Sequence, residues 1–172
     1  ASFDALHEVE RKLWLHKASF LKKDDNQTDE EFYSRAGIYA EFGKIVCISC
    51  GFITTHKGER QFRTKSFFND DEQIILAEFA KLLNIHFSRY ESLLCAHNGK
   101  EFDFPYICRR MLVNGIKLPV MLDIAGKKPW EVGHIDTMEL WKFGDYKHYT
   151  SLKLLAKIFG IPTPKDDIDG SQ

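Results

Sequence analysis

The chain has 172 residues, of which 44% are hydrophobic and 13% aromatic, which is enough for the core of one compact domain and too little for two ordinary ones. Its net charge of −1 excludes binding of nucleic acid by bulk positive charge, so such a partner needs a local basic patch or metal ions. No apolar run of about 18 residues predicts a membrane span, and the charged first segment is not typical of a signal peptide. Four cysteines are too few for a disulfide scaffold, and these features together predict a cytoplasmic protein without a membrane partner.

The first 43 residues are predicted to be helical. A first helix is expected from about Phe3 to Leu21, and a second from Glu30 to Phe42, closed by Gly43. The polar residues 22–29 between them form the segment that we expect to be mobile. The apolar side of the first helix is predicted to carry Leu6, Val9, Leu13 and Phe20.

A β-hairpin is predicted next. The β-rich run Ile45–Ile53 pairs plausibly with Arg60–Phe68 across a turn at residues 54–59. Cys47 and Cys50 have metal-ligand spacing, but an odd separation on a strand directs the two thiols to opposite faces, which argues against a zinc site.

The remaining elements alternate in the manner of an α/β protein. Asn69 with Glu72 three residues later is a helix start signal, and the helix is expected to face the sheet with Ile75, Phe79, Leu82 and Leu83. A short strand is predicted at Leu93–Ala96, and a helix follows its polar turn. A later helix is expected from Thr150, as its N-cap, to Phe159.

The polar turn between the short strand and its helix is the most informative segment. It reads His97-Asn98-Gly99-Lys100-Glu101-Phe102-Asp103-Phe104-Pro105-Tyr106-Ile107. This turn places one carboxylate, that of Asp103, after the carboxyl end of a strand, where α/β enzymes keep their chemistry. Asp136 with Glu139 repeats a helix-capping pattern, and His97 and His134 are expected to be hydrogen-bonded structural residues.

The block from Asn98 to Ile107 resembles the second sequence motif of the 3′–5′ exonucleases of the ribonuclease H-like superfamily, closest to the branch related to the proofreading domains of family B DNA polymerases. Residues His134–Gly144, Ser151–Ala156 and Asp167–Gln172 resemble the segments that follow this motif in stand-alone bacterial members. The resemblance runs roughly from Gly43 to Gln172. It implies a ribonuclease H-like mixed sheet flanked by helices.

The resemblance also implies a chemistry. Such enzymes hold two Mg²⁺ or Mn²⁺ ions about 4 Å apart with Asp and Glu oxygens. Asp103 would be a catalytic carboxylate and metal ligand, while Asn98 and Phe102 would lie beside the path of the 3′-terminal nucleotide. Each residue also has a structural alternative: Asp103 as a helix N-cap, Asn98 with Gly99 as an ordinary turn, and Phe102 as a core aromatic.

The family's first motif, Asp-x-Glu, and its third, Tyr-x-x-x-Asp, are not found in this sequence. We therefore expect residues 1–172 to be a single, truncated exonuclease-like domain whose first strand and last helices are absent. Because that first strand is central in the fold, the sheet is expected to have an unfilled place. Of the expected carboxylates only Asp103 maps onto the chain, and the fragment is predicted to be inactive or nearly so.

The predicted function is hydrolysis of terminal phosphodiesters of single-stranded or frayed DNA 3′ ends to nucleoside 5′-monophosphates, with RNA as a second candidate substrate. Basic residues interleaved with Trp130, Trp141, Tyr146 and Tyr149 are suited to a single strand, although they could equally be solvated or packing residues. A non-catalytic nucleic-acid-binding module on the same fold is the alternative. A protein-interaction domain is a third hypothesis, which predicts no affinity for DNA.

Overall fold

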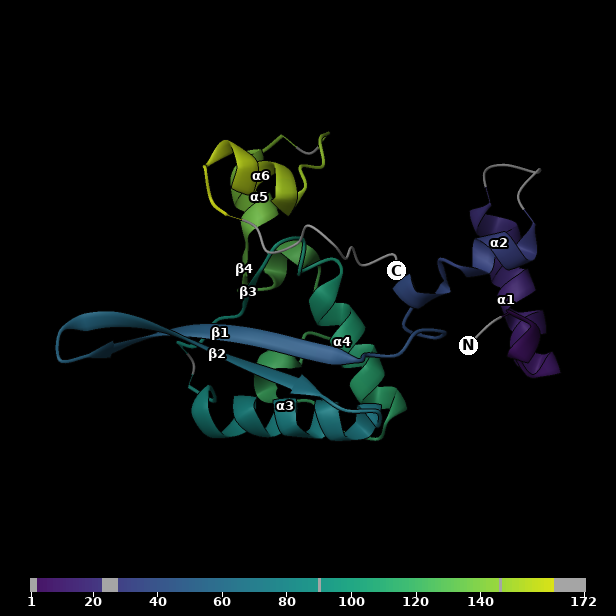
Figure 1. Ribbon diagram of the computed structural model, residues 1–172, viewed down its shortest axis with the longest axis horizontal. Coiled ribbons are helices and arrows are strands. Elements are labelled where there is room, and N and C mark those ends of the chain that lie inside the picture. The colour runs from purple at the N-terminus through teal and green to yellow at the C-terminus, as the bar shows by residue number, and fades with distance from the viewer. Residues whose placement is uncertain (1–2, 23–27, 90, 146, 163–172) are drawn as a thin grey trace. The chain divides into compact units, whose positions relative to one another are not determined.

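The computed structural model describes residues 3–22, 28–89, 91–145 and 147–162, which form two compact units that adjoin in sequence at Gly43 and Lys44 (Figure 1). Predictions that fall on residues 23–27, on Tyr146 or on residues 163–172, the last of which include the segment resembling the turn before the family's final helices, lie outside the described residues. No described helix is both long and apolar enough to cross a membrane.

The first unit is helical, as predicted, but its helices are shorter. Its elements are a 3-10 turn at Phe3–Ala5, α1 at Glu8–Leu21, α2 at Asp29–Tyr33 and a 3-10 turn at Ala36–Ile38. A reciprocal cap begins α2, because the Thr28 hydroxyl accepts the Glu31 N–H at 3.2 Å and the Glu31 carboxylate accepts the Thr28 N–H at 2.9 Å.

An aromatic cluster around Trp14 forms the core of this unit. The Trp14 side chain has no exposed surface, and its ring lies 5.1 Å from that of Phe42 and 5.2 Å from that of Tyr33, both edge-on. The apolar face predicted for α1 is wrong, since its residues Val9, Leu13 and Phe20 are more than half exposed. The helix instead buries Trp14 and Ala18, because the aromatic rings after α1 pack on that side.

The predicted hairpin is confirmed in the second unit. Strands β1, Cys47–His56, and β2, Glu59–Phe68, pair antiparallel from Cys47 with Phe68 to His56 with Glu59. The turn is tighter than expected, because Lys57 and Gly58 both have positive φ, 50° and 84°, as two-residue hairpin turns require. Cys47 is exposed, whereas Cys50 packs against the core on the other face.

Helix α3, Glu72–His86, buries Ile75, Phe79 and Leu83 against the hairpin, as predicted. Its start differs from the prediction by two residues. The N-cap is Asp71, whose carboxylate accepts the Gln73 N–H at 2.9 Å, and not Asn69. Glu72 is therefore no part of a capping box, and its side chain enters the interior.

A second, parallel pair of strands follows, made of β3, Cys95–Ala96, and β4, Ile135–Asp136. The sequence pattern did not predict β4, because two residues show no alternation. The described residues after α3 also form three α-helices and two 3-10 turns: α4 at Asp103–Val113, α5 at Thr137–Lys142, α6 at Leu152–Ile158, and the 3-10 turns at Val120–Leu122 and Pro129–Glu131. The N-cap of α6 is Ser151, whose hydroxyl accepts the Leu154 N–H at 3.3 Å, so the predicted cap at Thr150 is wrong by one residue.

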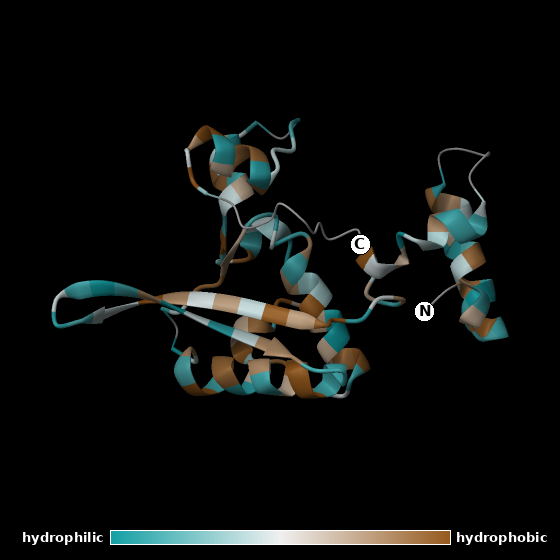
Figure 2. Ribbon diagram, in the orientation of Figure 1, coloured by the Kyte–Doolittle hydropathy of each residue, from teal (hydrophilic) through white to brown (hydrophobic). Residues whose placement is uncertain are grey.

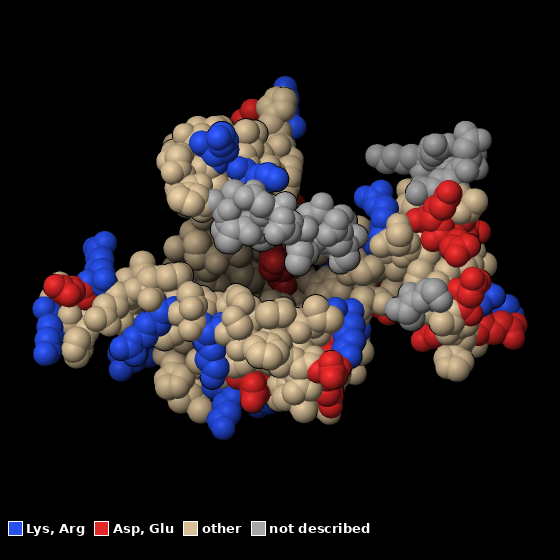
Figure 3. Space-filling model, viewed as in Figure 1, with Lys and Arg blue, Asp and Glu red and all other residues tan. Residues whose placement is uncertain are grey.

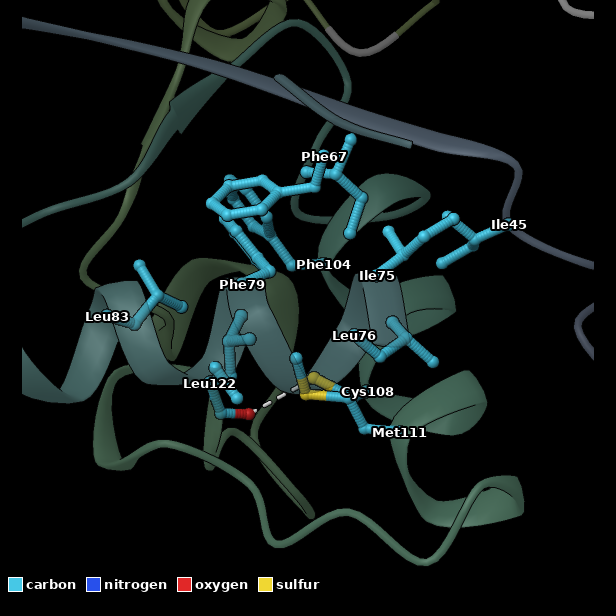
Figure 4. Close-up of a cluster of buried hydrophobic side chains, with 12 residues drawn as sticks. Ile45, Phe67, Ile75, Leu76, Phe79, Leu83, Phe104, Cys108, Met111 and Leu122 are labelled. Atoms are coloured by element: carbon cyan, nitrogen blue, oxygen red, sulfur yellow. Dashed lines mark hydrogen bonds between the residues drawn. The ribbon is translucent and has the colours of Figure 1, made fainter. Parts of the chain in front are cut away.

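The core of the second unit lies between one face of the hairpin and the helices α3 and α4. Phe67 from β2 meets Phe79 from α3 with ring centroids 5.9 Å apart, and Phe104 and Met111 from α4 pack against the same cluster (Figure 4). Figure 2 shows brown, apolar residues along β1 interrupted by white ones of intermediate hydropathy, and a teal, hydrophilic hairpin tip.

The mixed α/β class is confirmed, but the sheet of the described residues is in two parts. β1 pairs with β2 and β3 with β4, and no described strand joins the two pairs. Between them lies a groove of about 880 Å³, with β1 on one wall and Leu93–Ala96 on the other. Phe79 and Leu82 of α3 and Ile107 of α4 contribute to its apolar lining.

Candidate functional site

The polar turn between β3 and α4 is closed by its own backbone. Asn98 has φ 62°, in the left-handed region that asparagine tolerates better than most residues. The Phe102 N–H donates to the Asn98 carbonyl at 3.0 Å, and the Phe104 N–H donates to the Gly99 carbonyl at 2.9 Å. The turn thus delivers Asp103 as the first residue of α4.

Only glycine fits at position 99. A Cβ atom there would lie 2.5 Å from the Ala96 Cβ and 3.0 Å from the Phe104 ring. The turn therefore packs directly on the end of β3 and the start of α4, with no side chain between them.

Asp136 anchors this turn from the neighbouring strand. Its carboxylate is buried and accepts three backbone N–H groups, from Asn98 at 2.8 Å, Lys100 at 3.1 Å and Met138 at 2.9 Å. The bond from Met138 confirms the predicted cap, since it caps α5. The other two bonds were not predicted, because nothing in the sequence showed that Asp136 pairs with Ala96 across the parallel strands. One carboxylate thus fixes the turn and begins a helix.

A second contact ties the same turn to α5. The Lys100 ammonium lies 2.8 Å from the Glu139 carboxylate, and only 10% of the lysine side chain is exposed. Asp136 and Glu139 were expected to form one capping pattern; instead, Asp136 caps the helix and Glu139 pairs with Lys100.

His97 has a structural role, as predicted. Its Nδ1 lies 3.0 Å from the Thr137 hydroxyl, and its Nε2 donates to the Thr150 carbonyl at 2.7 Å. His97 therefore connects the turn to the start of α5 and to the segment that enters α6.

His134 is also structural. Its Nδ1 accepts the Leu94 N–H at 3.2 Å, and its Nε2 lies 2.8 Å from the Met121 carbonyl, which can only accept. The ring is therefore neutral, with its proton on Nε2. Burial lowers the pKa of His134, in agreement with this assignment.

Asp103 is exposed at the wall of the groove. The alternative that it is the N-cap is wrong by one residue, because Phe102 holds that position and its side chain makes no capping bond. A carboxylate in the first turn is still favoured by the partial positive charge of the helix N-terminus.

Phe102 and Asn98, the other two predicted site residues, lie in different environments. Phe102 lines the groove with 44% of its surface exposed, and its ring lies 5.7 Å from that of Tyr106, so the core alternative for Phe102 is wrong. The Asn98 Oδ1 atom is buried and has no hydrogen-bond partner within the described parts of the chain. An unsatisfied buried oxygen is rare in a folded protein and calls for an explanation.

The described residues do not form a complete metal site. Nowhere in residues 3–22, 28–89, 91–145 and 147–162 do three His, Cys, Asp or Glu side chains gather closely enough to hold an ion. Asp136 is buried with its carboxylate engaged by N–H groups, and Asp103 alone cannot hold two ions.

The described aromatic residues of the later half have separate contacts. Trp141 packs on Phe159 with ring centroids 5.8 Å apart, and Tyr149 lies by His97 at 6.5 Å. Trp130 is 74% exposed, and the Lys128 ammonium lies 5.2 Å from the centre of its ring. These contacts favour a packing role for Trp141, whereas Tyr149 remains 67% exposed.

The fold and this turn define an α/β protein with two adjacent parallel strands, each followed by a helix. An acidic residue lies at the start of each helix, Asp103 in α4 and Asp136 as the N-cap of α5. The family model of the RNase H superfamily matches residues 35–172, and the chain belongs to this superfamily. No curated protein and no solved structure matches the chain. Membership indicates a nuclease-type hydrolase with a nucleic-acid substrate, in a superfamily whose nucleases generally use divalent metal ions.

Proposed function

We propose that this protein is a cytoplasmic, metal-dependent 3′–5′ exonuclease that hydrolyses terminal phosphodiesters of single-stranded or frayed DNA and releases nucleoside 5′-monophosphates. The observation that carries the proposal is the place of Asp103 and Phe102, side by side in sequence on the wall of the groove, after a turn that Asp136 holds. Asp103 is the proposed catalytic carboxylate and one ligand of a Mg²⁺ or Mn²⁺ pair.

The chemistry of the three residues supports these roles. A carboxylate oxygen is the hard ligand that Mg²⁺ and Mn²⁺ prefer. The half-exposed ring of Phe102 offers a face on which a terminal base can stack, and the unpartnered Asn98 Oδ1 can accept a sugar hydroxyl. The hydrogen bonds that close the turn hold these groups in fixed positions, as a catalytic site requires.

The groove suggests where further ligands belong. β1 and β3 each pair on one edge only within the described residues, so their other edges can bond an additional strand. A strand parallel to β3 in this groove would bring its carboxyl end next to Asp103. We propose that carboxylates on such a strand complete the metal site and that residues 1–172 alone are inactive.

The test is digestion of 5′-labelled single-stranded and 3′-overhang oligonucleotides with Mg²⁺ or Mn²⁺ by the gene-length protein. Asp103→Asn is compared with Glu101→Gln, a matched control that removes one charge from an exposed carboxylate two residues earlier. We expect stepwise shortening from the 3′ end by the parent and the control, and a loss of about 100-fold or more in Asp103→Asn, as for removal of a group that stabilises transition-state charge.

Equal activity of the Asp103→Asn variant and the parent would remove Asp103 from the site. The lack of a three-ligand cluster within the described residues favours one alternative, a non-catalytic nucleic-acid-binding module. That module predicts oligonucleotide binding by a folded gene-length protein without any shortening. Neither binding nor shortening would leave the third hypothesis, a protein-interaction domain.

A further inference from the structure

The outer half of the β1–β2 hairpin, residues 53–63, extends past the support of α3, and we call it the hairpin arm (Figure 1). The ring contact between Phe52 of β1 and Phe87, 5.6 Å apart, lies just before the arm begins. Beyond it every residue of the arm is exposed or only partly buried. The arm is thus a two-stranded ribbon with both faces accessible.

The arm and its base are strongly basic in a nearly neutral chain. Between residues 44 and 68, Glu59 is the one acidic residue, against five basic ones: Lys44, Lys57, Arg60, Arg63 and Lys65. Lys57, Arg60 and Arg63 lie in the arm itself, and none of the ion pairs formed by the described residues includes them. Figure 3 shows blue Lys and Arg side chains over the hairpin, with a red acidic group among them at its tip. Their charge is therefore available to an anionic partner.

An exposed aromatic residue lies among these charges. Phe62 is 69% exposed and pairs across the ribbon with Ile53, which is exposed to the same extent. Its ring covers Gly51, where a Cβ atom would lie only 2.2 Å from the ring Cζ. Arg60 lies two residues away on the same face, since side chains alternate along a strand. Solubility explains exposed charges on an edge, but it does not explain an exposed apolar pair of an aromatic and a β-branched side chain.

We propose that the hairpin arm binds single-stranded nucleic acid, with Phe62 stacked against a base and Arg60 on a phosphate beside it. Arg63 lies on the opposite face of the ribbon and would contact a phosphate of the strand as it passes around the ribbon's edge. This assignment rests on the proposed nuclease function, which supplies the class of partner. Arginines on a ribbon combined with an exposed ring are the elements that bind a single strand without sequence preference: cations follow the backbone, and aromatic faces accept any base. Because Ile53 and Phe62 also line the groove, the arm would hold the part of the substrate that leaves it.

The proposed phosphate contacts of the two arginines are tested by measuring affinity for single strands. Fluorescence anisotropy of dye-labelled oligothymidine and oligouridine is recorded with the gene-length protein in EDTA over a series of salt concentrations. Arg60→Ala/Arg63→Ala is compared with Lys81→Ala/Arg89→Ala, which removes two exposed charges elsewhere in the same unit. We expect the arm variant to bind about 10-fold more weakly, and the slope of log affinity against log salt to fall by about 1.4, since each lost phosphate contact on a single strand accounts for about 0.7. The control is expected to keep the parent's affinity and slope.

The ring is tested separately. Phe62→Leu keeps an apolar cover over Gly51 but removes the aromatic face, so we expect binding about 10-fold weaker with an unchanged salt slope, as for the loss of one stacked base. Melting temperatures of all variants equal to the parent's would show that they remain folded. Comparison of the affinities for oligothymidine and oligouridine tells whether the arm distinguishes DNA from RNA.

The arm assignment fails if both arm variants bind like the parent, and it fails equally if the control loses as much affinity as the arm variant. The outcomes separate it from the exonuclease proposal. Normal binding by the arm variants together with loss of cleavage in Asp103→Asn would overturn the arm alone. Arm-dependent binding by a parent that never shortens an oligonucleotide would keep the arm and overturn the enzyme.

Discussion

The Asp136 carboxylate holds the backbone of Asn98 from the adjacent parallel strand, with the Asn98 N–H donating to Oδ1 at 2.8 Å. The same oxygen accepts the Met138 N–H, while Oδ2 accepts the Lys100 N–H. Asp136 therefore shapes the turn of the candidate site, whereas Asp103 is the proposed catalytic carboxylate and metal ligand.

Replacement of this anchor should destabilise the protein. Asp136→Asn keeps one acceptor oxygen but turns an NH₂ group toward the Lys100 N–H, so two donors would face each other in a buried place. We expect a loss of about 2 kcal/mol in the free energy of unfolding, measured by urea denaturation. The exposed Asp103→Asn is expected to change stability by less than about 0.5 kcal/mol. Equal effects of the two variants would contradict the division of roles between Asp136 and Asp103.

Gly99→Ala should be destabilising because of the close contacts around the turn. The new methyl group would lie 2.5 Å from the Ala96 Cβ, so the turn must move. We expect this movement to lower the free energy of unfolding by about 1–3 kcal/mol. Gly133→Ala is the matched control, since a Cβ there meets nothing within 4 Å and its φ is not positive. Thermal unfolding of both variants decides the matter, and a Gly99→Ala melting temperature equal to that of the control would show that the turn has room.

The ion pair between Glu72 and Arg110 ties α3 to α4. Glu72 is 5% exposed and also accepts the Ile45 N–H at 2.7 Å and the Asn114 amide at 3.0 Å. Burial by itself raises the pKa of Glu72, but the hydrogen bonds from Arg110, Ile45 and Asn114 outweigh it, and the pKa lies below its ordinary value of 4.5.

Arg110→Ala should leave this buried carboxylate without its charge partner. We expect the free energy of unfolding to fall by about 3–5 kcal/mol at neutral pH. Arg109→Ala, on the exposed side of α4, is expected to change it little. The stability that the lowered pKa of Glu72 contributes is present above pH 4.5 and is lost as the pH falls through that pKa. Urea denaturation from pH 7 to pH 3 should therefore show a smaller acid loss in the variant; an identical loss would argue against Glu72 as its source.

His134 should make the protein sensitive to mild acid. Because burial lowers its pKa, the neutral ring contributes stability that is fully present above pH 6.5 and is lost as the pH falls from 6.5 toward the lowered pKa. Protonation of Nδ1 would also break the bond from the Leu94 N–H. We expect His134→Gln to be less stable at pH 7.5 but to lose less stability on acidification, whereas the exposed His148→Gln follows the parent. A parent whose stability is constant between pH 7.5 and 5 would contradict the neutral assignment.

The sequence predicted those parts of the fold that local pattern determines. The hairpin follows from two β-rich runs on either side of a turn, and α3 follows from helical spacing. The polar turn was found because it separates an apolar run from a helix. The parallel pair of Cys95–Ala96 with Ile135–Asp136 could not be predicted, because each strand is two residues long and their pairing depends on tertiary contacts. The roles of Asp136 in the turn and Glu72 in the interior were missed for the same reason. The buried side of α1 was predicted wrongly because the helix buries the one large indole of Trp14 among aromatic rings and leaves several smaller apolar side chains exposed.

The buried indole of the first unit gives the two units separate optical signals. Trp14 is the one tryptophan in residues 1–43 and has no exposed surface, whereas Trp130 and Trp141 of the second unit are exposed to solvent. Emission from Trp14 should therefore be shifted to the blue of that from the other two, and it should move to the red when the cluster of aromatic rings around it opens. A protein with Trp130→Phe and Trp141→Phe would report, by fluorescence alone, whether the helical unit melts together with the rest of the chain or before it.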